Sequence, residues 1–203
     1  YYGYSDSVVF RPDLPLLLVR AGLDRSAMND RVDATVAAAL KENAPVTVLN
    51  LPAGHHGFEL LDDDAYSRTA CAQTLEWMKS ALEPANQAAL RARAPLAEAA
   101  SALLKGDGAR AAALFAPLVA ASPADKTLRL SYGEALLAAG RAKEARAQLE
   151  PLRDAGLGHR DLGIPAARAA AADNDPAAAI AWLARIPKRF RPAALATDPA
   201  FSS

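Results

Sequence analysis

The pattern of hydrophobic positions changes near residue 84, and the two parts of the chain predict different architectures. Before that point, short unbroken apolar runs alternate with stretches in which apolar residues recur every three to four positions. After it, the chain is rich in alanine and follows the helical period with short breaks. The stretch EPANQ is a predicted junction, because Pro84 ends a helix and Asn86 caps the next one. We therefore expect a first segment 1–82, a linker 83–86 and a helical segment 87–203.

The first segment alternates between predicted strands and predicted helices. The run PLLLVRAG (15–22) is short, apolar and ends in glycine, as expected of a buried parallel strand. The run PVTVLNLP (45–52) is β-branched and bounded by prolines, which predicts a second strand. Amphipathic helices are predicted over residues 26–44 and 62–82. This order indicates a mostly parallel α/β sheet, to which we expect residues 1–10 to add a further strand end.

The second segment repeats every 34 residues. Three kinds of position recur at this spacing: small residues, large apolar residues, and turn residues that precede a helix. These sets are Ala111, Ala145 and Ala179; Phe115, Leu149 and Leu183; and Gly106, Gly140 and Asn174. Gly133 falls where the first helix of a unit carries a small residue against the second. The period and these positions resemble the tetratricopeptide repeat, a helix–turn–helix unit, in about three copies over residues 92–190.

Two polar residues follow the predicted strands directly. Asp24 comes after the first strand, in RAGLDR, and His56 comes after the second, in AGHHGF. Parallel strands end at the same edge of a sheet, and neighbouring strands lie about 5 Å apart. We therefore expect the carboxylate and the imidazole to meet, with Asp24 orienting the ring and His56 carrying a proton. His55, the adjacent residue, is expected to play no catalytic part.

The words AGLD and GHHGF, with the strands and helices around them, closely resemble the C-terminal part of the dienelactone hydrolase family over about residues 1–82. The resemblance implies a Ser(Cys)–Asp–His triad in which Asp24 is the acid and His56 the base. It implies a small ester or lactone as substrate, and no cofactor or metal. No G-x-S-x-G or G-x-C-x-G elbow occurs in the chain, so we expect the nucleophile to lie in an upstream part that this sequence does not contain.

The predicted architecture is therefore the C-terminal half of an α/β-hydrolase sheet, followed by an all-α tetratricopeptide-like repeat module. The sequence allows two functions, and it does not decide whether the chain is part of an enzyme. The first is ester or lactone hydrolysis through Asp24 and His56. The alternative is a non-catalytic scaffold in which the repeats bind a protein or peptide partner and the hydrolase-like segment is inert. Four arginines predict a basic strip for acidic partner ends: Arg129, Arg141, Arg146 and Arg153.

Bulk composition narrows the partners further. A formal net charge of zero provides no long-range field to attract nucleic acid or anionic membranes. No apolar run approaches the ~20 residues that a membrane helix needs. The single cysteine, Cys71, excludes an internal disulfide. The sequence does not assign a cellular compartment, so localisation stays unknown.

Overall fold

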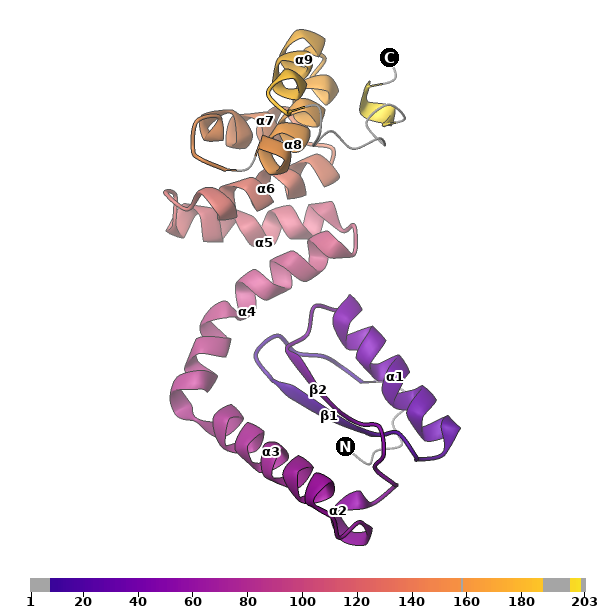
Figure 1. Ribbon diagram of the computed structural model, residues 1–203. Coiled ribbons are helices and arrows are strands. Elements are labelled where there is room, and N and C mark those ends of the chain that lie inside the picture. Colours follow the sequence, from indigo (N-terminus) through magenta and orange to yellow (C-terminus); the bar gives the residue numbers. More distant parts are fainter. Residues whose placement is uncertain (1–7, 158, 188–197, 202–203) are drawn as a thin grey trace. The chain divides into compact units, whose positions relative to one another are not determined.

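The computed structural model describes residues 8–157, 159–187 and 198–201 (Figure 1). The chain divides into two compact units, Tyr1–Ser101 and Ala102–Ser203, and each is described by itself. The helix that crosses this boundary, α4, runs from Pro84 to Leu104. The expected division into segments 1–82 and 87–203 stays a prediction.

The first unit is built around one parallel pair of strands. Its elements are β1 (Leu16–Ala21), α1 (Ser26–Lys41), β2 (Val46–Leu51), α2 (Phe58–Leu61) and α3 (Ala65–Leu82). Strand β1 pairs with β2 in register from Leu16 opposite Val46 to Ala21 opposite Leu51. Because successive side chains point to opposite faces, the two faces of this sheet meet different helices.

One face of the pair packs on α3 and the other faces α1. Leu51 is buried with Phe58 and Ala70, and the half-buried Val19 packs against the same cluster. On the opposite face, Arg20 forms an ion pair with Asp33 of α1 at 2.7 Å. Each helix thus covers one side of a β–α–β unit, which is the arrangement expected for a parallel pair joined by a crossover helix.

The prediction of an α/β-hydrolase half-sheet is wrong. Among the described residues the sheet contains two strands, β1 and β2, whereas a hydrolase half-sheet requires further strands. Residues 8–10 form no strand, and residues 1–7 lie outside the described part of the chain. The local pattern correctly predicted a β–α–β unit, but such a unit occurs in many folds and does not determine how many strands flank it.

The second unit consists of helices packed in sequence order (Figure 1). After the end of α4 it contains α5 (Gly108–Ala121), α6 (Lys126–Ala138), α7 (Ala142–Leu149), the 3-10 turn η1 (Glu150–Leu152), α8 (His159–Ala172), α9 (Pro176–Ala184) and the 3-10 turn η4 (Pro199–Phe201). Each helix from α5 to α9 packs against the next along the chain. This succession fits the predicted helix–turn–helix units.

The 34-residue period corresponds to one backbone turn that occurs three times. The turn residues Gly106, Gly140 and Asn174 all have positive φ angles, of 77°, 72° and 58°. At each turn, the next residue donates its N–H to a carbonyl five positions earlier, which ends the preceding helix with a Schellman bond. These bonds are Asp107 N–H to Ala102 O, Arg141 N–H to Leu136 O, and Asp175 N–H to Ala170 O.

The core of the second unit contains most of the small and large residues that recur in the repeat. Ala111, Ala145 and Ala179 are all buried, as are Phe115 and Leu149. In α9 the expected large residue, Leu183, is only half-buried, and the adjacent Trp182 is buried instead. The buried large side chain of α9 is therefore the indole, one position before the leucine that the period indicates.

Gly133 allows α6 and α7 to approach each other closely. A Cβ atom at this position would lie 2.6 Å from Cδ2 and 2.7 Å from Cγ of Leu149. These distances are well inside ordinary van der Waals contact. The predicted role of Gly133 as the small residue against the second helix agrees with this packing.

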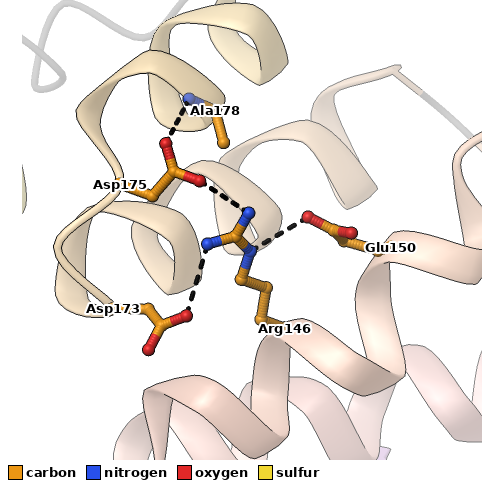
Figure 2. Close-up of polar contacts among 5 residues, drawn as sticks. All are labelled: Arg146, Glu150, Asp173, Asp175 and Ala178. Atoms are coloured by element: carbon orange, nitrogen blue, oxygen red, sulfur yellow. Dashed lines mark hydrogen bonds and ion pairs between the residues drawn. The ribbon is translucent and has the colours of Figure 1, made fainter.

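Arg146 joins α7 to the turn before α9 (Figure 2). Its guanidinium donates to Glu150 at 2.9 Å, to Asp173 at 3.3 Å and to Asp175 at 2.7 Å. Asp175 also accepts from the N–H of Ala178 and so caps α9. The hydrogen bonds that Arg146 donates to Glu150 and then to Asp175 raise its pKa above the ordinary value.

We expect Gly133→Val to lower the free energy of unfolding by about 1–3 kcal/mol, the usual effect of overpacking a core. The valine would occupy the space of Leu149, so the double variant Gly133→Val with Leu149→Ala should recover part of the loss. Chemical denaturation measures both. The matched control, Ala147→Val at an exposed position of α7, should change little; an equal loss in this control would contradict the packing argument.

Asp175→Ala should lower the melting temperature by a few degrees more than Asp107→Ala. Asp107 caps α5 in the same way that Asp175 caps α9, but the structure records the additional bond to Arg146 at Asp175. The N–H of Ala178, then Arg146, hold the pKa of Asp175 below its ordinary 3.8 against the opposing effect of burial. Its stabilisation is therefore present above that value and lost as the pH falls through the lower folded-state pKa. Thermal melts at pH 7 and below about pH 4 should show that the difference in melting temperature between Asp175→Ala and Asp107→Ala becomes smaller in acid. Equal melting temperatures of the two variants at pH 7 would refute the role of Arg146.

Candidate functional site

The first candidate site lies where the two parallel strands of the first unit end. Asp24 follows β1 and His56 follows β2, and the last residues of these strands are register partners. The Nδ1 atom of His56 lies 2.9 Å from Oδ2 of Asp24. The structure thus brings together the two residues that the sequence placed at one sheet edge. Their catalytic role stays a prediction.

Backbone hydrogen bonds hold the two loops beside each other. The N–H of Gly22 donates to Leu51 O at 2.7 Å, and the N–H of Leu23 donates to Gly54 O at 2.9 Å. The N–H of Arg25 donates to the second carboxylate oxygen of Asp24 at 2.7 Å. The loop after β1 is therefore fixed against the loop after β2, and the carboxylate is fixed within it.

The surroundings of the pair favour the ionised form of Asp24. Burial raises the pKa of Asp24, but the hydrogen bonds from His56 and from the Arg25 N–H outweigh it, so the pKa lies below its ordinary value. An ionised carboxylate only accepts, so a hydrogen bond between the two side chains requires the imidazole tautomer with its proton on Nδ1. The Asp24 side chain is 11% exposed and that of His56 is 58% exposed. The acid is therefore largely buried beneath an accessible ring.

A cavity of about 390 Å³ lies beside this pair. Asp24 and His56 both line it, and most of its wall is apolar, with Val19, Met28 and Phe58 among the lining residues. An apolar cavity with a few polar groups at one side is typical of small-molecule sites.

A second histidine–carboxylate pair stands next to the first. Nδ1 of His55 lies 3.0 Å from Oδ1 of Asp62, and the backbone N–H of His55 donates to the same carboxylate. His55 does not contribute to the wall of the cavity that His56 lines. The contact of His55 with Asp62 joins the two ends of the segment between β2 and α3. It can therefore be compared with the His56–Asp24 pair, which lines the cavity.

In the part of the chain that the structure describes, no cluster of three or more His, Cys, Asp or Glu side chains is arranged to hold a metal ion. Among the described helices, none combines the length and the apolarity needed to span a bilayer.

The second candidate site is a groove of about 600 Å³ in the second unit. The helices that line it are α6, α8 and the end of α4, whereas α5, α7 and α9 do not contribute. Helices α6 and α8 are the first members of the packed pairs α6–α7 and α8–α9. The wall mixes apolar residues such as Leu137 with the charged Glu134 and Arg168. Burial and then the nearby Asp161 raise the pKa of Glu134, while Arg168 partly offsets them.

The expected basic strip does not line this groove. Its four arginines are engaged elsewhere: Arg129 with Pro123 O, Arg141 with Glu144, Arg146 with its three carboxylates, and Arg153 over the ring of Trp182. Arg168, which does line the groove, was missed. The period offered a signal for it, because Arg168 lies one repeat after Glu134 on the equivalent helix.

Comparison with known proteins supports the helical part of the chain. No curated protein and no solved structure matches the chain. Nothing in these comparisons supports the resemblance of residues 1–82 to the dienelactone hydrolases. A tetratricopeptide repeat family model matches residues 102–162, which contain α5, α6 and α7. The chain thus carries a tetratricopeptide-like helical part, to which the groove belongs.

Proposed function

We propose that the chain is a protein-binding scaffold whose helical repeats hold a segment of a partner protein in the groove between α6 and α8. The observation that carries this proposal is the groove itself, whose wall comes from α6, α8 and the end of α4, with the turn η4 beside them. Stacked helical repeats present such a face as an extended binding surface. The match of residues 102–162 to the tetratricopeptide repeat supports the same role.

The chemistry of the groove suits a peptide with both apolar and charged side chains. Leu103 and Leu137 offer apolar surface from two helices, and Arg168 offers a guanidinium whose side chain is 51% exposed. Apolar contacts supply affinity, while a guanidinium fixes the position of a carboxylate through directed hydrogen bonds. The groove therefore favours a short segment that contains an acidic residue.

The test begins with a photo-crosslinking amino acid at Leu137, in the groove, and separately at Ala147, on the exposed face of α7. Adducts from an extract of the source cells should form from Leu137 and not from Ala147. The partner identified in this way is then purified, and calorimetry measures its binding to the Leu137→Glu and Ala147→Glu variants. We expect about a tenfold loss for Leu137→Glu, the effect of losing a well-packed interface contact. Equal affinities of the two variants would refute the groove as the binding surface.

A second candidate function rests on the Asp24–His56 pair. We infer that His56 can act as a general base in hydrolysis of a small ester or lactone, with Asp24 holding the ring and the apolar cavity accepting the acyl group. Its support is the 2.9 Å contact between the two side chains at the wall of that cavity. The mechanism also requires a nucleophile, which we assign to no residue of the chain.

In the natural protein, Asp24→Asn should reduce ester turnover about 10⁴-fold, because an amide in place of the carboxylate favours the wrong imidazole tautomer. The rate is measured with a series of small chromogenic esters and lactones. His55→Ala is the matched control, since it removes a neighbouring histidine with its own carboxylate partner outside the cavity. Near-normal turnover in Asp24→Asn, or an equal loss in His55→Ala, would exclude the pair from catalysis.

A further inference from the structure

The segment Asp198–Phe201, here called the DPAF segment, lies against the groove of the second unit. Its turn η4 packs on α8, and Asp198, Pro199 and Ala200 form part of the groove wall. Nε and Nη2 of Arg168 lie 2.8 Å and 2.7 Å from Oδ2 of Asp198. Arg168 and Asp198 are 30 positions apart in the chain. Their contact therefore joins the groove to a segment that is distant in sequence.

The contact differs from an ordinary surface ion pair. The side chain of Asp198 is only 8% exposed, whereas that of Arg168 is 51% exposed, so the carboxylate is largely covered and the guanidinium stays accessible. Burial raises the pKa of Asp198, but the Ala200 N–H and Arg168 outweigh that effect and lower it. A fully exposed pair contributes little to stability, whereas a largely covered carboxylate that accepts from two guanidinium nitrogens is held in a defined position.

The DPAF segment presents this carboxylate from a turn that it forms by itself. The N–H of Ala200 donates to Oδ1 of Asp198 at 3.0 Å, and the N–H of Phe201 donates to Asp198 O at 3.0 Å. One carboxylate oxygen is thus held within the segment and the other meets Arg168. The same local turn is available to any peptide with this sequence.

The groove is larger than the part that the DPAF segment occupies. The open space of about 600 Å³ lies between the segment, α8 and the wall formed by Glu134 and Leu137 of α6. The segment therefore holds the Arg168 side of the groove and leaves the α6 side accessible. A partner peptide that needs Arg168 would have to displace it.

We propose that the groove recognises a short acidic, proline-containing peptide through Arg168, and that the DPAF segment is its resident ligand within the same chain. This inference rests on the proposed protein-binding function and adds to it the chemistry of the partner and a competition that limits its binding. A tethered ligand acts at an effective concentration on the order of millimolar. Weakening the DPAF segment should therefore strengthen binding of the same peptide added from outside.

The test uses the full chain and a fluorescent peptide with the sequence of residues 196–203, ATDPAFSS. Fluorescence anisotropy compares the wild type with Asp198→Asn. We expect Asp198→Asn to bind the peptide about tenfold more tightly, because its own segment no longer competes at millimolar effective concentration. In that variant, the peptide ATNPAFSS should bind at least tenfold more weakly than ATDPAFSS. The peptide comparison alters no residue of the protein, so misfolding cannot explain its result.

A second pair of variants tests the guanidinium. Adding Arg168→Gln to Asp198→Asn should abolish peptide binding, whereas adding Arg141→Gln, which removes an exposed arginine paired with Glu144, should leave it unchanged. Circular dichroism establishes that both remain helical. Equal peptide affinity in the wild type and Asp198→Asn, or peptide binding that ignores Arg168, would overturn the inference. So would light scattering that shows the DPAF segment engaged between two copies rather than within one.

The inference and the proposed function can fail separately. If the partner found by crosslinking binds the wild type and Asp198→Asn equally well, the scaffold role stands and the resident ligand does not. If crosslinking from Leu137 captures nothing but the peptide binds as expected, the groove recognises its own segment and the proposed partner is refuted.

Discussion

The groove of the second unit depends on how closely its paired helices approach each other. At Gly133 the absence of a side chain lets Leu149 lie within 2.6 Å of where a Cβ atom would stand. Ala145, fully buried on α7, carries only a methyl group. Because α6 closes on α7 along this face, its other face is left to line the groove with α8. Packing of small residues therefore decides where the groove lies before any charged side chain is considered.

Two arginines of this unit show how the same side chain serves different purposes. Arg146 meets carboxylates from the helix end and from the turn before α9, and so it fastens one helix pair to the next. Arg168 lines the groove, and its carboxylate partner, Asp198, comes from a segment beyond α9. The first cluster stabilises the fold from within. The second joins one side chain of α8 to one side chain of the DPAF segment and involves no other helix.

The sequence predicted those features that follow from a short-range rule. A turn with a left-handed residue recurs at Gly106, Gly140 and Asn174, because each helix must end with the same backbone bonds. The meeting of Asp24 and His56 was predictable because parallel strand ends share one edge of a sheet. Features without such a rule were missed. The pattern of one β–α–β unit cannot specify further strands, and the charge of Arg168 could not be distinguished from that of other helix arginines without placing it in the repeat.

The two histidine pairs of the first unit show why a contact distance alone does not define a catalytic site. His55 with Asp62 and His56 with Asp24 have nearly equal spacing, 3.0 Å and 2.9 Å, and both carboxylates are largely buried beneath more exposed rings. Only His56 and Asp24 both lie in the wall of the apolar cavity. A carboxylate that orients an imidazole does so equally well in a structural loop. A catalytic histidine requires in addition a space where a substrate can bind beside the ring. The cavity, and not the hydrogen bond, is therefore what distinguishes His56 from His55.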